Sequence, residues 1–68
     1  MTVQLNGEDT RIDENTSIAQ LLTQLELTGK RLAVEVNQQI VPRSDFASHI
    51  LKADDRVEIV QAIGGGSL

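Results

Sequence analysis

The sequence predicts an α+β fold in which a mixed sheet of four to five strands packs on one main helix, with a short second helical turn. Segments that alternate apolar and polar residues stand near both ends and in the middle of the chain, which is typical of strands with one buried face. Between the first two of these segments, apolar residues recur at the spacing of an amphipathic helix. With 68 residues the chain has room for one domain only.

The first expected element is a hairpin. Residues 1–5 alternate apolar and polar side chains, which predicts a strand. Asn6 and Gly7 both tolerate a positive φ, as a tight hairpin turn requires. Ile12 then stands between charged residues, so we expect a weak second strand at an edge of the sheet.

The main helix is expected to begin at Ser17, because Ser17 and Gln20 have the spacing of a capping box. One apolar face follows at Ile18, Leu21, Leu22 and Leu25. Gly29 is placed to end the helix in the left-handed conformation. A helix after a hairpin acts as a right-handed crossover, so we expect the third strand to run parallel to the first.

The middle of the chain predicts a second pair of strands. Residues 32–36 alternate in character, residues 37–39 form a turn, and residues 40–41 make a brief apolar strand. Pro42 ends this strand, and because proline cannot donate to a strand ladder, the strand is expected to be short and peripheral.

The last part of the chain predicts a short helical turn and a final strand. Ser44 is placed to cap the turn, whose inward side chains are expected to be Phe46, Ile50 and Leu51. Asp54 and Asp55 form a turn before the strand at 56–63. In that strand one face carries Val57 and Ile59, and the other carries Glu58, Val60 and Ala62.

Composition excludes several classes of function. Without cysteine there is no thiolate nucleophile, and the single histidine, His49, with scattered acids provides neither a metal site nor a catalytic constellation. The net charge is −4 and the six basic residues are dispersed, which argues against nucleic-acid binding. The N-terminus lacks a secretion signal and no run approaches a membrane span, so we expect a cytoplasmic chain without membrane contact.

The final strand passes directly into Gly64, Gly65 and Gly66. Residues without a Cβ make a thin, unhindered tail, which is the shape needed to place a terminal carboxylate in the active site of another protein. The alternative is a flexible linker or a cloning remnant, which has the same composition.

A series of segments along the chain helps to decide between a reacting tail and a linker. They are Val3-Gln4-Leu5-Asn6-Gly7, Ser17-Ile18-Ala19-Gln20-Leu21-Leu22, Ala33-Val34-Glu35-Val36-Asn37, Ile40-Val41-Pro42-Arg43, Asp55-Arg56-Val57-Glu58-Ile59-Val60 and Ile63-Gly64-Gly65. Together, over nearly the whole chain, they resemble the small ubiquitin-like sulfur carrier proteins, the ThiS/MoaD family, and most closely its thiamine-biosynthesis branch. The resemblance implies a β-grasp (ubiquitin-like) domain over residues 1–63, with the C-terminal strand central beside the first, and a flexible tail over residues 64–68.

The resemblance also implies a carrier of activated sulfur that is not itself an enzyme. A ThiF-type adenylyltransferase would use ATP and magnesium to join AMP to the terminal glycine. A sulfurtransferase or a cysteine desulfurase would supply the sulfur, and a ThiG-type thiazole synthase would consume the resulting thiocarboxylate. The chain itself would bind no cofactor and would be a monomer when free.

The resemblance places the reacting terminus at Gly66, with Gly64 and Gly65 as the motif pair. Ser67 and Leu68 depart from the family pattern, because they put the free carboxylate on a bulky leucine. We expect these two residues to be removed by processing or to stem from cloning.

One exposed face of a β-grasp sheet near the tail would carry Ala33, Glu35, Glu58, Val60 and Ala62. We expect this face to dock on the activating enzyme, with Ile63 as an apolar anchor at the root of the tail. The alternative is an ordinary half-exposed sheet face. Asp54 is a further departure, since the family often has glycine there, and we expect a small local cost without loss of function.

Other functions stay open as alternatives. The small carrier subunit of molybdopterin synthase shares the fold and the Gly-Gly end, but such chains are usually longer and less similar around residues 37–43. A non-catalytic ubiquitin-like binding module would use the glycines only as a linker and would show no ATP-dependent chemistry at its terminus. A small enzyme has the least support, because the chain offers no triad or metal spacing.

Overall fold

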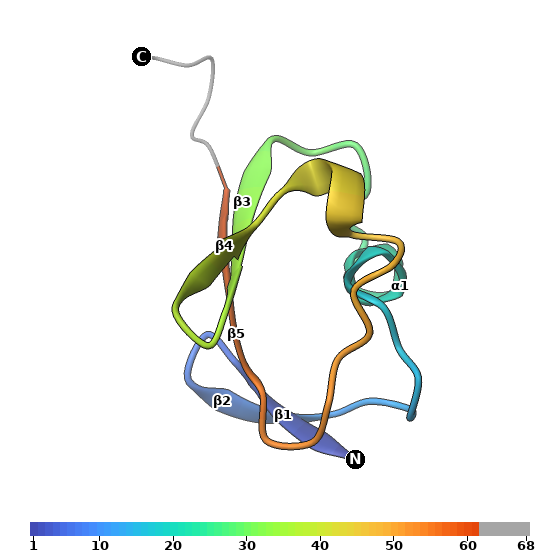
Figure 1. Cartoon of the computed structure of the whole chain (residues 1–68), viewed down its shortest axis with the longest axis vertical. Coiled ribbons are helices and arrows are strands. Elements are labelled where there is room, and N and C mark those ends of the chain that lie inside the picture. Colours follow the sequence, from blue (N-terminus) through green and yellow to red (C-terminus); the bar gives the residue numbers. More distant parts are fainter. Residues whose placement is uncertain (62–68) are drawn as a thin grey trace.

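The computed structural model describes residues 1–61 and shows one sheet with a helix packed on one face (Figure 1). The elements are β1 (Thr2–Leu5), β2 (Glu8–Arg11), α1 (Ile18–Gln24), β3 (Leu32–Val36), β4 (Gln39–Val41), the 3₁₀ turn η1 (Arg43–Asp45) and β5 (Arg56–Gln61). Five strands lie in the order β2-β1-β5-β3-β4. This mixed sheet under one helix confirms the predicted β-grasp, with β5 central and with β2 and β4 at the edges.

The strand directions correct one prediction. β5 runs parallel to β1 and antiparallel to β3, so β3 is antiparallel to β1 and not parallel to it as expected. The reason is that the crossover through α1 starts from β2, which has already reversed the chain relative to β1. The crossover therefore makes β3 parallel to β2, and the parallel partner of β1 is β5.

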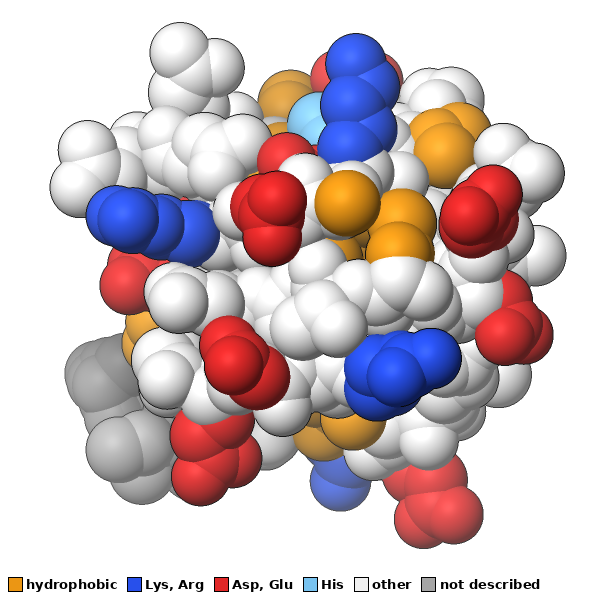
Figure 2. Space-filling model, turned by 90° about the horizontal axis from the view of Figure 1, so that it is seen from below, with side chains coloured by type: hydrophobic (Ala, Val, Ile, Leu, Met, Phe, Trp, Pro, Cys, Tyr) orange, Lys and Arg blue, Asp and Glu red, His pale blue; other side chains and the backbone are white. Residues whose placement is uncertain are grey.

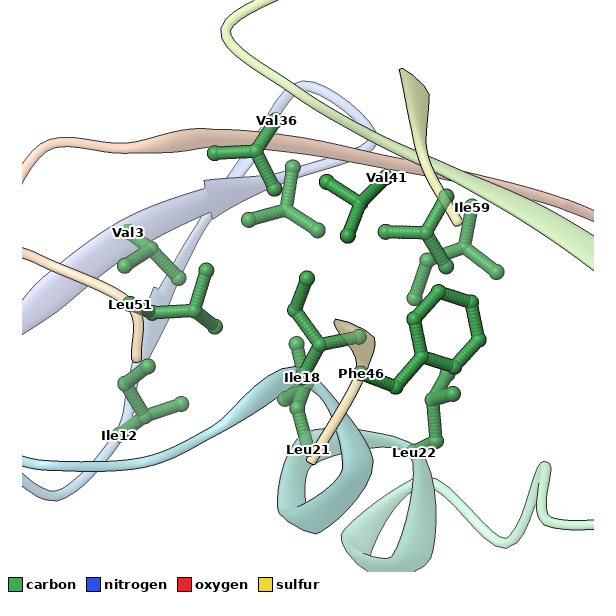
Figure 3. Packing of buried hydrophobic residues seen from close by; sticks show 12 residues of the cluster. Val3, Ile12, Ile18, Leu21, Leu22, Val36, Val41, Phe46, Leu51 and Ile59 are labelled. Atoms are coloured by element: carbon green, nitrogen blue, oxygen red, sulfur yellow. The ribbon is translucent and has the colours of Figure 1, made fainter. Parts of the chain in front are cut away.

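The hydrophobic core lies between α1 and the inner face of the sheet (Figure 3). From α1, Ile18 and Leu21 point toward the strands and are 0% and 1% exposed. From the central strands, Val34 and Val57 are buried to a similar degree. The alternation in the sequence predicted the two inward strand residues, because each strand places every second side chain on the same face.

The start of α1 is the predicted capping box. The hydroxyl of Ser17 accepts a hydrogen bond from the backbone N–H of Gln20 at 3.1 Å. In return, Oε1 of Gln20 accepts from the backbone N–H of Ser17 at 2.9 Å. Two amide groups that have no carbonyl partner within the helix are thus satisfied.

The end of α1 differs from the prediction. The N–H of Leu27 donates to the carbonyl of Leu22 at 2.8 Å, and the N–H of Glu26 donates to Thr23 at 3.0 Å, which is a Schellman ending. Glu26 takes the left-handed position with a φ of 61°, so Gly29 does not end the helix and lies in the loop that follows. Leu27 packs against the core, and burying this side chain requires the chain to reverse before Gly29 is reached.

The first hairpin uses the tight turn that the sequence predicted, and the second turn is one residue shorter than predicted, because Gln39 already pairs with Val36 in β4. Asn6 and Gly7 have φ values of 50° and 86° between β1 and β2. Asn37 and Gln38 have φ values of 53° and 70° between β3 and β4. Two consecutive residues with positive φ are the signature of a type I′ turn, whose twist matches that of the flanking strands.

The segment between β4 and β5 is partly as predicted. Phe46 and Leu51 are buried, but Ile50 is 43% exposed and does not face inward. Ser44 does not cap η1: it lies within the turn, and the capping position is held by Pro42 without a side-chain hydrogen bond. Ile50 lies outside η1, in an isolated antiparallel bridge with Ser17, and adjacent residues of an extended segment point to opposite sides, so Leu51 is buried and Ile50 is not.

Candidate functional site

The candidate site is organised around the C-terminal end of β5. Gln61, the last residue of β5, lies opposite Leu32, the first residue of β3. β5 therefore ends in the middle of the sheet, beside the loop between α1 and β3 (Figure 1). The predicted motif residues Gly64, Gly65 and Gly66, together with Ala62, Ile63 and the boundary between domain and tail, lie outside the described residues.

Asn6 holds β5 from the β1 side. Its Oδ1 accepts from the backbone N–H of Ile59 at 2.9 Å, and its Nδ2 lies 3.4 Å from the carbonyl of Ile59. Its own N–H donates to the carbonyl of Val57 at 2.9 Å. The side-chain amide thus continues the parallel ladder beyond the end of β1 and supports β5 up to Ile59.

Asn37 holds the other end of β5 in a similar way. Its Oδ1 accepts from the N–H of Arg56 at 3.0 Å, and its N–H donates to the carbonyl of Arg56 at 2.8 Å. Its Nδ2 donates to Asp55 at 3.0 Å, and the same carboxylate accepts from the N–H of Lys52 at 2.8 Å. The turn before β5 is thereby fastened to the β3–β4 hairpin.

The sequence predicted both asparagines only as turn residues. The hydrogen bonds from their side-chain amides to β5 join residues 53 and 19 positions apart along the chain. A local sequence pattern carries no information about such distant partners. The one local signal is the residue type itself. An asparagine at a turn position that requires positive φ has a side chain short and polar enough to reach a neighbouring backbone.

The open face of the sheet carries the described part of the predicted docking surface. Ala33 lies opposite Val60, and Glu35 lies opposite Glu58, so the four side chains share the face that α1 does not cover. Val60 is 66% exposed. The sequence analysis missed Ile40, which lies opposite Glu35 in β4 and is 72% exposed. We call Ala33, Glu35, Ile40, Glu58 and Val60 the open sheet face.

Two arginines border this face at the tail end. Arg31 and Arg43 line an open hollow together with Leu32, Ala33, Val60 and Gln61. Nη2 of Arg43 donates to the carbonyl of Lys30 at 3.2 Å, which ties η1 to the loop before β3. Arg43, expected from the sequence to be a solvated cation after a strand terminator, therefore also joins two loops beside the root of the tail.

Metal-ligand clusters and membrane-spanning helices are both absent from the part of the chain that the structure describes. Within residues 1–61 no group of three or more His, Cys, Asp or Glu is placed to hold a metal ion. In the same residues no helix is long and apolar enough to cross a membrane. Seen from the end where the N-terminus lies, acidic side chains are dispersed and the cationic ones stand apart without forming a stripe (Figure 2). The features that stand out are the end of β5 and the open sheet face.

A β-grasp sheet whose central strand leads into a run of glycines defines the class of small ubiquitin-like carrier proteins. Within that class the chain belongs to the ThiS family, whose model matches residues 3–66. The match confirms the resemblance to this family that the sequence segments indicated.

Individual relatives agree with this assignment. The sulfur carrier protein ThiS of Escherichia coli (strain K12) is 33% identical over 66 residues, which cover 97% of this chain and 100% of that protein. The crystal structure of the thiamine biosynthesis protein ThiS from Geobacter metallireducens is 29% identical, with a TM-score of 0.82 over 97% of this chain and 100% of that one. The thiazole synthase of Paramagnetospirillum magneticum is 37% identical over 67 residues, which cover 98% of this chain but only 21% of that protein.

Proposed function

We propose that this chain carries sulfur to thiazole formation as a thiocarboxylate on its C-terminal glycine, which is Gly66 once Ser67 and Leu68 are removed. The observation that supports this most is the extent of the family match. It runs from residue 3 through the β-grasp domain and ends at Gly66, so Ser67 and Leu68 fall outside it.

The chemistry follows from the properties of a carboxylate. A carboxylate is a poor electrophile, so ATP first reacts with the terminal carboxylate to give an acyl-adenylate and pyrophosphate, with magnesium bound to the phosphates. A sulfur nucleophile such as hydrosulfide then attacks the acyl carbon, the bond to AMP breaks, and a thiocarboxylate remains. A ThiF-type adenylyltransferase would catalyse the first step, and a sulfurtransferase or cysteine desulfurase would supply the sulfur.

Glycine suits the positions next to this carbon. A Cβ would crowd the narrow slot in which the tail must lie and would hinder attack at the carbonyl. Gly64 and Gly65 thus act as the motif pair that leads to Gly66. The absence of cysteine from the chain fits a carrier whose sulfur is bound at the terminus and not on a side chain.

The proposed docking surface comprises Ala33, Glu35, Glu58 and Val60, continued by Ala62 and Ile63. Gly66 lies five positions beyond Gln61, the last residue of β5, so an extended tail would reach at most about 18 Å from the sheet. An enzyme that binds the tail in its active site would therefore lie close to the end of β5. The open sheet face is the exposed surface that continues directly from that end.

A thiazole synthase is the proposed acceptor of the sulfur. The thiazole synthase of Paramagnetospirillum magneticum contains a stretch similar to nearly the whole of this chain, which makes up about a fifth of that protein. A carrier joined to its consumer in one polypeptide supports direct contact between the two activities. We propose that this chain makes the corresponding contact as a separate monomer in the cytoplasm.

The test is intact mass spectrometry of two chains, one ending at Gly66 and one ending at Leu68. Each is incubated with ATP, magnesium, a ThiF-type adenylyltransferase and sulfide. The chain ending at Gly66 is expected to gain the mass of an oxygen-to-sulfur exchange, and the chain ending at Leu68 is expected to stay unchanged. If the shorter chain also stays unchanged with an enzyme that activates its own carrier, the sulfur-carrying terminus is refuted in favour of a ubiquitin-like binding module.

A further inference from the structure

The turn between β1 and β2 contains a pair of residues that can react with each other. Asn6 is the only one of the three asparagines in the chain that is followed by a glycine. The backbone nitrogen after an asparagine can attack the side-chain carbonyl carbon, and a following glycine favours this attack because it has no Cβ to block the approach. Asn6 and Gly7 are both exposed, so water reaches them. The turn therefore carries the groups needed for spontaneous deamidation.

The fold directs the side-chain amide of Asn6 toward a different partner. Its Oδ1 accepts from the backbone N–H of Ile59 at 2.9 Å, and its Nδ2 lies 3.4 Å from the carbonyl oxygen of Ile59. Both polar atoms of the amide thus face β5. Attack by the nitrogen of Gly7 requires the carbonyl carbon of Asn6 to turn toward the next peptide group instead. The reaction therefore requires that the contacts with Ile59 open first.

We infer that Asn6 is a site of spontaneous deamidation in the folded chain, and that the local opening of its hydrogen bonds to Ile59 sets the rate. In the opened turn the nitrogen of Gly7 forms a bond to Cγ of Asn6, and the bond from Cγ to Nδ2 breaks. Ammonia leaves with the proton that the nitrogen of Gly7 loses. Water then opens the cyclic imide at either carbonyl, which gives aspartate or isoaspartate. The reaction needs no enzyme, oxidant or reductant, and the inference does not depend on the proposed function.

The position of Asn6 in the sheet allows this opening to be local. β1 pairs with β5 through Gln4 and Leu5, and the contacts of Asn6 come at the end of this pairing. On its other side β5 pairs with β3 as far as Gln61, which lies opposite Leu32. The strand can therefore stay in the sheet while the amide of Asn6 turns away. Two net hydrogen bonds shift such an opening equilibrium by about 5- to 30-fold, far less than global unfolding requires.

Either product changes the support of β5. Aspartate has a second oxygen in place of Nδ2, and an ionised carboxylate cannot donate to the carbonyl of Ile59. Isoaspartate carries the main chain through the former side chain and adds an atom to the two-residue turn, which disturbs the pairing of Leu5 with Glu8. Deamidation thus weakens the hold on β5 from the β1 side.

The experiment measures the rate of deamidation at each asparagine of the full chain, held at mildly alkaline pH and constant temperature. Samples contain no denaturant, guanidinium chloride below the unfolding transition, or enough guanidinium chloride to unfold the chain. Cleavage after Arg11, Lys30 and Arg43 puts Asn6, Asn15 and Asn37 in separate peptides, whose masses report the exchange of amide for acid. Gly7→Ala is the control and is compared in the unfolded chain only, where the φ of 86° that Gly7 has in the turn is of no consequence.

In the unfolded chain Asn6 is expected to react faster than Asn15 and Asn37, and Gly7→Ala is expected to remove this difference. Folding is expected to slow the reaction at Asn6 by about 5- to 30-fold, the effect of two net hydrogen bonds. Guanidinium chloride below the transition is expected to leave the rate in the folded chain nearly unchanged. The reason is that a local opening exposes little surface, whereas global unfolding depends steeply on denaturant.

Three results would overturn the inference. Equal rates at Asn6 in the folded and the unfolded chain would show that the contacts with Ile59 give no protection. A rate in the folded chain that rises with denaturant in parallel with global unfolding, or no reaction there at all, would exclude a local opening. A rate at Asn6 no higher than at Asn15 in the unfolded chain would remove the role of Gly7.

Discussion

Asn6 and Asn37 show how single residues can position a strand that lies far from them in sequence. Each occupies a turn position with positive φ, and each uses its side-chain amide to bind backbone groups of β5. The amides complete the pairing of β5 where β1 and β3 have already ended. The strand that precedes the glycine run is thus held at Arg56 by one turn and at Ile59 by the other.

Asn6 can be tested with two substitutions that separate its two roles. Asn6→Gly keeps the positive φ and removes the amide, so we expect a loss of about 1 kcal/mol in the free energy of unfolding. Asn6→Ala adds the strain of a left-handed residue with a Cβ, which raises the loss to about 2–3 kcal/mol. Denaturant unfolding measures both. An unchanged free energy of unfolding in Asn6→Gly, beside a loss in Asn6→Ala, would show that backbone conformation, and not the amide, is the main contribution of Asn6.

At the scale of elements, α1 shows why local signals identify the start of a helix better than its end. The start depends on Ser17 and Gln20, which are three positions apart and bond to each other, so the pattern alone is sufficient. The end depends on where the chain must turn for Leu27 to reach the core. Gly29 has the residue type that favours a left-handed ending, but tertiary packing places that ending at Glu26.

This assignment predicts a stabilising change at Glu26. Its side chain is exposed and its φ is 61°, a conformation that strains any residue with a Cβ. We expect Glu26→Gly to raise the free energy of unfolding by about 0.5–1 kcal/mol, after the greater freedom of glycine in the unfolded chain is counted. Glu26→Ala, which keeps the Cβ, serves as the matched control and is expected to bring no such gain. A loss of stability in the glycine variant would contradict the role assigned to Glu26.

At the scale of the whole molecule, the sequence predicted which helices and strands form better than it predicted how the strands run relative to one another. The alternation of residues 32–36 and 56–61 identified the central strands and their inward side chains, because burial on one face imposes a period of two. The predicted direction of β3 relative to β1 was wrong, because this direction depends on which strand of the first hairpin leads into the crossover. Glu35 and Ile40 could not be recognised as neighbours from the sequence alone, since only the register of β3 with β4 brings them together.

The proposal that the open sheet face docks on the activating enzyme can be tested at Val60. Val60→Asp is expected to leave the free energy of unfolding within about 0.5 kcal/mol of the wild type, because the side chain is 66% exposed. The same change places a third carboxylate beside Glu58 and removes an apolar contact, so we expect KM for adenylation to rise at least about 10-fold. Ala47→Asp, at an exposed position between η1 and β5, is the control. Unchanged adenylation kinetics in a folded Val60→Asp variant would exclude this face as the docking surface.

The central place of β5 also has a mechanical consequence. The N–H groups of Gln4 and Asn6 donate to carbonyls of Asp55 and Val57 at 2.9 Å, which joins two parallel strands that start at the same end of the sheet. Tension between the N-terminus and the C-terminus therefore pulls β1 and β5 in opposite directions along their shared ladder. The hydrogen bonds are loaded together in shear and do not open one by one, so a partner that pulls on the C-terminal end meets the resistance of the whole ladder at once.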